Sequence, residues 1–387
     1  MSQYKKVGFF FRLFVLTKKI VGFIIKFMEL KIYVEPDFSE SYWCHQYLKG
    51  IRSEAKKNKL NVCVANELAF EDRPTELAMV LGVSCPWVRS VVSACENAGM
   101  RTVVVGYAPQ EDEIVYHKNS YVSLDYSEAV RLLLDKLEKD GRSRIALFAI
   151  ADDSSNDLAK KKEFIARRGA ASLADVYKRH ERMDVTCESF AECAHKYDGV
   201  VCANDISAIL LMEHLAAHGV SVPGDIEIAT IGNSTLARTA AMFPMIHLDC
   251  EDIGKRAVGL YMQLYKDRGI NSQSLFIRSR FANSAAEEQK RSASPDFSMP
   301  QAHINFTYDM AVSSLEELER ILHNCDNTDI EILRALTLDM TYGEIAELLN
   351  ISENTVKYRT GALCKAFGVS KKNDLVILAS RFYNDKI

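Results

Sequence analysis

Residues 199–233 read GVVCANDISAILLMEHLAAHGVSVPGDIEIATIGN. The runs at 199–205 and 227–233 are rich in Val, Ile and Ala and predict buried strands, and residues 206–218 between them predict a helix. A strand, a helix and a second strand at this spacing favour two parallel strands joined by a helical crossover.

The same alternation runs through most of the chain. Further strand-like runs occupy residues 31–36, 61–66, 77–83, 102–107 and 144–150. Residues 128–139 precede the last of these runs and place apolar side chains on one face of a helix. This alternation predicts mostly parallel sheets with helices on both faces. Because the strands form two groups, before and after about residue 125, we expect two such sheets.

The pattern changes after the last of these strands. Residues 283–306 are polar, carry two prolines and break all periodicity, which marks a linker. The sequence beyond the linker predicts only helices, at 314–324, 329–338, 342–349, 352–367 and 372–382. Thr328 with Glu331, and Thr341 with Glu344, have the spacing of capping boxes, which specify where a helix begins.

The predicted helix at 352–367 has two distinct faces, with Ser352 as its expected N-cap. At 100° per residue, Val356, Leu363 and Phe367 fall on one line, which predicts the buried face. Apolar residues of the preceding helix and turn supply the partner surface: Ile345, Ala346, Leu349 and Ile351. The remaining surface carries the candidate DNA-binding residues: Asn354, Thr355, Lys357, Tyr358, Arg359, Gly361 and Lys365.

Two short helices across a tight turn, with cations on the second, have the geometry of a helix-turn-helix. From Asn350 to the end the chain has seven cations and three acids, whereas residues 328–349 have one cation and five acids. Because phosphate neutralisation supplies much of the affinity for DNA, the positive side should face the duplex. Gly361 costs about 1 kcal/mol relative to alanine, which is understandable if DNA approaches the backbone there. The alternative is a small packing module with a solvated basic face.

The C-terminal residues resemble the four-helix DNA-binding domain of LuxR/NarL-type regulators. The resemblance covers about 60 residues and rests on Glu344-Ile345-Ala346, Ile351-Ser352, Thr355-Val356-Lys357 and Gly368-Val369. It implies that Lys357 contacts DNA and that Arg359, in place of the usual histidine, donates to phosphate. A second basic position of the family is Ala366 here, for which Lys365 is a substitute. The fourth helix of that family pairs subunits, which implies a homodimer held through Leu375, Leu378 and Ala379.

Roughly residues 30–286 resemble the ligand-binding region of LacI/GalR-type regulators, which is similar to periplasmic sugar-binding proteins. The N-D-x-x-A motif at Asn204 and the G-x-x-x-P-x-D-I motif at Gly219 carry this resemblance. It implies two α/β lobes joined by hinge crossovers, with a small molecule such as a sugar or nucleoside held between them. The DNA-binding headpiece of that family precedes the sensor, whereas here the helix-turn-helix follows it.

Five residues are candidates for binding that ligand: Tyr42, Trp43, Lys160, Asp205 and Asn233. Asp205 ends a predicted strand, where ligands of open α/β sheets bind, and the family uses this aspartate to accept hydrogen bonds. Its alternative role is the N-cap of the following helix. Tyr42 and Trp43 could stack on a sugar ring or lie in the core. Lys160 and Asn233 replace an arginine and part of a G-F-D motif of the family, so recognition should differ.

The length of 387 residues and the formal net charge of −4 are those of an ordinary globular chain. Ten cysteines show no CxxC and no paired spacing, so we expect a reducing, cytoplasmic setting and neither a metal nor another cofactor. Residues 1–27 are basic and apolar, and cations interrupt them too often for a membrane span. They are a non-native or disordered leader, a membrane-surface segment or an anchor. The expected divisions are 1–27, the ligand-binding domain 28–286, the linker and connecting helix 287–325, and the DNA-binding domain 326–387.

These features predict a ligand-responsive transcriptional regulator, with a DNA operator and a small-molecule effector as partners. A membrane-tethered or exported solute-binding protein is the alternative, although it gives the helical C-terminus no role. An enzyme is disfavoured, because the sequence has no GxSxG, P-loop, GxGxxG after a strand, or HExxH motif.

Overall fold

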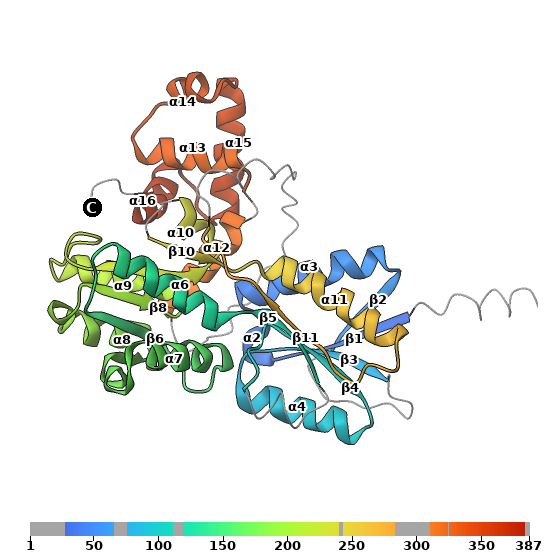
Figure 1. Cartoon of the computed structure of the whole chain (residues 1–387). Coiled ribbons are helices and arrows are strands. Elements are labelled where there is room, and N and C mark those ends of the chain that lie inside the picture. Colours follow the sequence, from blue (N-terminus) through green and yellow to red (C-terminus); the bar gives the residue numbers. More distant parts are fainter. Residues whose placement is uncertain are drawn as a thin grey trace, which may run out of the picture.

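The computed structural model describes residues 28–65, 76–110, 119–239, 243–282, 310–323 and 325–383, and Figure 1 shows their arrangement. The predictions for residues 1–27 and for the linker at 283–306 lie outside the described residues. The described strands form two parallel sheets, one in each of two lobes. The predicted class, two α/β lobes followed by helices, is therefore confirmed.

The first lobe has a sheet in the order β11-β5-β4-β3-β1-β2. Its strands are β1 (Met28–Val34), β2 (Leu60–Ala65), β3 (Leu77–Leu81), β4 (Arg101–Val105), β5 (Ser120–Leu124) and β11 (Ser274–Ile277). Its helices are α2 (Pro36–Ser39), α3 (Tyr42–Lys57), α4 (Cys85–Asn97) and α11 (Cys250–Lys266). Helices α3 and α11 cover one face and α4 the other, so alternate residues of β1, such as Ile32 and Tyr33, are buried on opposite faces.

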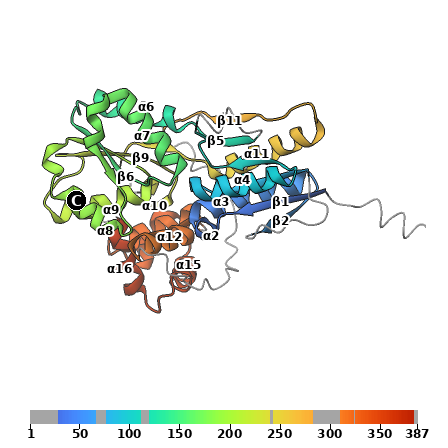
Figure 2. The same cartoon turned by 90° about the horizontal axis from the view of Figure 1, so that it is seen from below.

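The second lobe repeats the plan with a sheet in the order β10-β9-β8-β6-β7. Its strands are β6 (Ile145–Ile150), β7 (Val176–Lys178), β8 (Gly199–Cys202), β9 (Glu227–Gly232) and β10 (Met245–His247). Its helices are α6 (Tyr126–Lys139), α7 (Ser155–Arg168), α8 (Met183–Ala191), α9 (Asp205–Ala217) and α10 (Thr235–Thr239). Figure 2 shows α6 and α7 on one face of the sheet and α8 and α9 on the other.

Four strands were not predicted, namely β5, β7, β10 and β11. Strands β7 and β10 have three residues each and carry too little apolar pattern to be recognised. The two buried serines of β5, Ser120 and Ser123, hide that strand in the sequence. The chain passes between the lobes after β5, after β10 and after β11, and these crossovers form the hinge.

The C-terminal region is helical throughout its described residues. Its helices are α12 (Met310–His323), α13 (Asn327–Thr337), α14 (Tyr342–Leu349), α15 (Glu353–Ala366) and α16 (Lys372–Tyr383). The capping box predicted at Thr341 is confirmed, but the one predicted at Thr328 is wrong. Helix α13 begins earlier, where Asp326 and Asp329 cap it reciprocally, because a short aspartate can play either part of the box.

Candidate functional site

Helices α14 and α15 form the predicted helix-turn-helix, and local sequence fixes the turn between them. Helix α14 ends at Asn350, which adopts a left-handed backbone with φ of 52° that asparagine tolerates better than most residues. Two residues later the Ser352 hydroxyl accepts a hydrogen bond from the Thr355 N–H at 3.1 Å, so the predicted N-cap is confirmed. Val356 and Leu363 are fully buried, as expected, whereas Phe367, the third residue of the predicted buried face, is half-buried.

The outward face of α15 is exposed and cationic. Tyr358 is 79% exposed, the most open of the large apolar side chains in the described residues. Other exposed members of this face are Asn354, Lys357, Gly361 and Lys365. Lys357 makes a 2.7 Å ion pair with Glu353, one turn earlier on the same helix. That pair is open to solvent and therefore weak, so Lys357 is available to a phosphate or a base.

Arg359 is oriented away from this face. Its Nη1 donates to both carboxylate oxygens of Asp326, at 3.0 and 2.9 Å, and to Asp329 at 2.8 Å. The Arg359 side chain is 27% exposed, and the Asp329 side chain is nearly buried. Burial raises the pKa of Asp329, and the guanidinium partly offsets this rise. Arg359, which the resemblance implied as a phosphate donor, thus forms ion pairs inside the protein and joins α15 to the start of α13.

The surface of α16 also differs from the expectation. Leu375 and Ala379, expected to pair subunits, are buried inside the C-terminal helices, and Leu378 is half-buried. The outward apolar residue of α16 is Ile377, which is 69% exposed. The helix uses Leu375 and Ala379 to complete its own core, whereas Ile377 is open to a subunit contact.

The ligand candidates of the first lobe lie at the start of α3. Ser41 caps this helix by accepting a hydrogen bond from the Cys44 N–H. Tyr42 is buried, and its hydroxyl lies 3.3 Å from Nδ1 of His323 on α12. Trp43 is half-buried, with its ring edge-on to Tyr42 at 6.3 Å between centroids. The structure therefore brings Tyr42 against the C-terminal connecting helix.

Asp205 is fully buried at the carboxyl end of β8. Its carboxylate accepts hydrogen bonds from the N–H groups of Asn233 at 3.0 Å and Ser234 at 2.7 Å, in the loop after β9. Burial raises the pKa of Asp205, and these hydrogen bonds partly offset the rise. The alternative role as N-cap is wrong, because Asn204 caps α9 instead. Asn233 itself is half-buried, and its hydrogen bond to Asp205 brings two of the predicted ligand candidates together.

Lys160 is buried beneath the same strand ends. Its ammonium donates to Asp157 and to the carbonyl of Ala203, each at 2.7 Å, and lies 5.0 Å from the Tyr126 ring centroid. These contacts satisfy the charge internally. Lys160, a predicted ligand-binding residue, therefore joins α7 to Ala203, which follows β8 and lies two residues before Asp205.

The lobes are bonded directly to each other on the side of β3 and β6. Asn156, at the start of α7, donates to the carbonyl of Gly106 and accepts from the N–H of Ala108, both at 2.9 Å. Backbone hydrogen bonds also join residues 83–85 to residues 153–155. Sequence patterns missed Asn156, because its partners lie about 50 positions earlier and an isolated asparagine has no pattern.

Glu319 of α12 is a second residue that sequence patterns missed. It is fully buried and accepts hydrogen bonds from the N–H groups of Thr235 at 2.6 Å and Leu236 at 3.0 Å. Burial raises the pKa of Glu319 to about 7, and nearby Asp205 adds to the rise against these hydrogen bonds. A glutamate on a helix is normally solvent-exposed. The burial of Glu319 becomes evident only from its partners, which lie far away in the sequence.

Replacing Glu319 with glutamine should change how stability depends on pH. Because the folded pKa is near 7 and the unfolded pKa near 4.5, folded wild-type protein binds the extra proton between these values. Its free energy of unfolding should therefore fall relative to the Glu319→Gln variant as pH rises through this window, by at most about 3 kcal/mol. Urea unfolding of both proteins across the window measures this difference. Glu344→Gln is the control with opposite sign, since bonds from Thr341 lower the pKa of Glu344, and a pH-independent difference for Glu319 would contradict its burial.

The described residues contain no cluster of three or more potential metal-binding side chains. None of the helices in the described part of the chain has the length and apolar character needed to cross a membrane.

Two family models match separate parts of the chain. One, described as a periplasmic binding protein-like domain, matches residues 134–283. The other, described as winged helix-turn-helix DNA-binding, matches residues 326–366. The chain thus joins a periplasmic-binding-protein-like α/β domain to a C-terminal helix-turn-helix. The second match is to a different family from the LuxR/NarL type, although residues 325–383 form helices and no strand that could serve as a wing.

Solved structures with the same fold include several transcription regulators. A transcription regulator from Lactobacillus plantarum is 18% identical with a TM-score of 0.52, covering 66% of this chain and 97% of that one. The regulator CelR in complex with cellobiose is 15% identical with a TM-score of 0.57, covering 66% and 83%. A LacI family regulator from Enterococcus faecium with bound ribose is 15% identical with a TM-score of 0.52, covering 66% and 97%. No curated protein sequence matches at a significant level, and at these identities the likeness concerns the fold.

Proposed function

We propose that this chain is a transcriptional regulator that binds double-stranded DNA through α15 and a small-molecule effector between its two lobes. The observation that carries the proposal is the exposed cationic face of α15, held on a capped helix-turn-helix in the same chain as a two-lobe binding-protein fold. Packing alone does not require Lys357, Tyr358 and Lys365 to share an open face. Binding in a DNA groove explains this arrangement, because phosphates attract the cations and base edges accept their hydrogen bonds.

The module itself fits the four-helix LuxR/NarL type. Helices α13 to α16 follow each other with short turns, and residues 325–383 include no strand. In this arrangement α15 enters the major groove and two copies bind half-sites about one helical turn apart, so we propose a homodimer. Among the described side chains of α16, Ile377 is an exposed apolar residue that can make that contact. The corresponding domain divisions are 28–286 for the sensor and 326–387 for the DNA reader.

The effector proposed here is a sugar or a related polar molecule. Two of the similar structures hold cellobiose and ribose. The two-lobe fold places the carboxyl ends of its strands opposite each other, which is where ligands of such sheets bind. Candidate residues for this contact are Trp43 and Asn233, since both are only half-buried. A thermal-shift screen of the full chain against sugars, nucleosides and amino acids tests this class, and stabilisation by amino acids alone would contradict it.

Replacing Lys357 with alanine should weaken DNA binding about 10- to 100-fold, or about 1–3 kcal/mol, because a base-edge or phosphate contact is lost. Duplexes are first selected with the wild-type chain from random sequences, and affinity is then measured by fluorescence anisotropy at several salt concentrations. Lys57→Ala is the matched control, because Lys57 also pairs with a glutamate one turn earlier on an exposed helix face, but in the first lobe. Equal losses in both variants, or no selected duplex at low ionic strength, would refute the proposed function.

A further inference from the structure

Helix α12 lies between the lobes and the helix-turn-helix. In both views it runs beside α10 and α9 of the second lobe and near α3 of the first (Figures 1 and 2). It packs against α8, α9 and α10 on one side and α3 on the other. The connecting helix therefore contacts both lobes, although it lies outside the sensor division 28–286.

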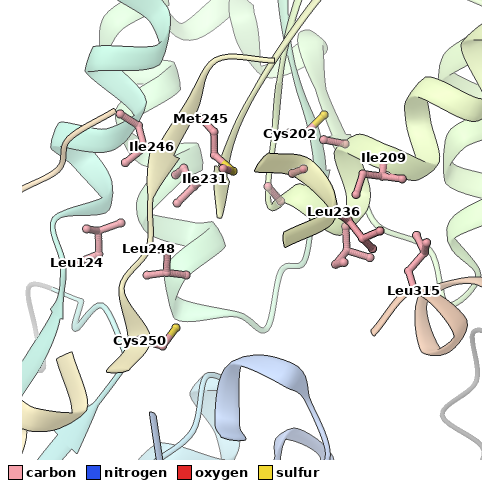
Figure 3. Packing of buried hydrophobic residues seen from close by; sticks show 14 of the residues in the cluster. Leu124, Cys202, Ile209, Ile231, Leu236, Met245, Ile246, Leu248, Cys250 and Leu315 are labelled. Carbon is pink, nitrogen blue, oxygen red and sulfur yellow. The ribbon is translucent and has the colours of Figure 1, made fainter. Parts of the chain in front are cut away.

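The attachment of α12 to the second lobe is both apolar and charged. Leu315 is buried beside Leu236 of α10 and close to Ile209 of α9, as Figure 3 shows. Four residues further along α12, the carboxylate of Glu319 accepts the backbone N–H groups of Thr235 and Leu236. In the ionised form of Glu319, these hydrogen bonds are roughly twice as strong as neutral ones, and their burial adds to this.

Two carboxylates bind the loop after β9 and the first residues of α10. Asp205 takes the N–H groups of Asn233 and Ser234, and Glu319 takes those of the next two residues. Movement of this segment would therefore change the hydrogen bonds of Asp205 in the second lobe and of Glu319 in α12. Burial raises the pKa of both carboxyl groups, and the charge of Asp205 raises the pKa of Glu319 further.

The attachment of α12 to the first lobe includes a hydrogen bond between two neutral side chains. The Tyr42 hydroxyl lies 3.3 Å from Nδ1 of His323, with the two rings edge-on at 5.5 Å between centroids. A single neutral hydrogen bond contributes about 1 kcal/mol, less than the paired bonds of a buried carboxylate.

The far end of α12 leads directly into the DNA reader. Cys325 is buried, and its N–H donates to the carbonyl of Leu322 at 3.0 Å, so the connection to α13 is short. Asp326 then caps α13 and accepts from Arg359 of α15. Asp326, which holds α15 through Arg359, therefore lies close in sequence to His323, which contacts the first lobe. The separation is less than the length of one helical turn.

We propose that α12 is the element that transmits lobe movement to the DNA-binding helices. It is fastened to the second lobe through Glu319 and releases the first lobe at Tyr42 when the lobes open, so that the helix-turn-helix moves with the second lobe. An effector that favours one lobe separation thereby selects one position of α15 relative to the first lobe. This regulation rests on the proposed function, since it needs a DNA reader at the end of α12.

Hydrogen exchange of the full chain tests the attachment without an effector. Asn156→Ala removes two hydrogen bonds between the lobes and should open them. We expect amides of the first turn of α3 to exchange about tenfold faster, while those of Thr235 and Leu236 stay protected. Glu319→Ala should instead expose the amides of Thr235 and Leu236. Faster exchange at Thr235 and Leu236 in Asn156→Ala, or unchanged protection there in Glu319→Ala, would overturn the assignment of Glu319 as the fixed anchor.

Coupling is tested with Tyr42→Phe, which removes only the hydroxyl that meets His323. Its affinity for the duplex selected by wild-type protein should change at least about threefold, with the amides of Thr235 and Leu236 unaffected. Asn61→Ala, an exposed residue of β2, is the control. Unchanged affinity in both Tyr42→Phe and Glu319→Ala would refute transmission through α12. Absence of DNA binding by the wild-type chain would refute the proposed function instead, while the exchange results would still decide how α12 is held.

Discussion

Replacing Arg359 with alanine should destabilise the C-terminal helices by about 3 kcal/mol. The substitution removes the guanidinium that pairs with both Asp326 and Asp329 and leaves Asp329 buried without this compensation. Loss of one member of a buried ion pair is far more costly than loss of an exposed pair, because the remaining charge stays desolvated. Pulse proteolysis in urea, following the C-terminal fragment of the full chain, measures the free energy of unfolding of this region.

Two further variants separate this role from a phosphate contact. Lys365→Ala should leave stability unchanged, since Lys365 is exposed. Arg359→Lys should recover little, because an ammonium cannot bridge two carboxylates as a planar guanidinium does. If Arg359→Ala kept its stability but lost DNA affinity as Lys357→Ala does, the phosphate role implied by the sequence resemblance would hold and the internal role would be wrong.

Replacing Gly50 with alanine should destabilise the first lobe by about 3 kcal/mol or more. A Cβ at Gly50 would lie closer than 3.0 Å to the backbone carbonyl of Glu251, because α3 and α11 pack with their backbones in near contact. Because the backbone of Glu251 cannot rotate away from the added Cβ, the two helices must move apart. Overpacking of this kind commonly costs about 1–3 kcal/mol even where side chains can shift. Thermal and urea unfolding of the full chain measure the loss.

Gly259→Ala is the matched control on α11, since a Cβ there meets nothing within 4 Å. That variant should be neutral or stabilised by up to about 1 kcal/mol, because alanine favours a helix over glycine. Because α3 carries Tyr42, Gly50→Ala should also loosen the contact with α12. Equal stability of the two variants would show that α3 and α11 can separate without cost, contrary to their packing.

The elements that could be predicted from the sequence are those whose signal is local. The Val- and Ile-rich runs of β1, β3, β4, β6, β8 and β9 stand out because both faces of a parallel sheet are buried. The helix-turn-helix was equally recognisable, because Thr341 and Ser352 cap their helices within three residues and Val356 and Leu363 repeat at helical spacing. The same patterns predicted that Lys357, Tyr358 and Lys365 lie on an open face, and all three are exposed in the structure.

Which polar residues remain free to bind depends on packing between distant elements. Arg359 belongs to the predicted cationic surface by its position on the helix, yet it meets its aspartates 33 and 30 positions earlier. Tyr42 meets His323 across 281 positions, and Glu319 meets Thr235 across 84. Periodicity and capping report on neighbours within a few residues, whereas the partner of a buried charge comes from another part of the fold. Local patterns were therefore enough for the lobes, the helix-turn-helix and most of its exposed face, but the way α12 joins them could be learned only from the folded chain.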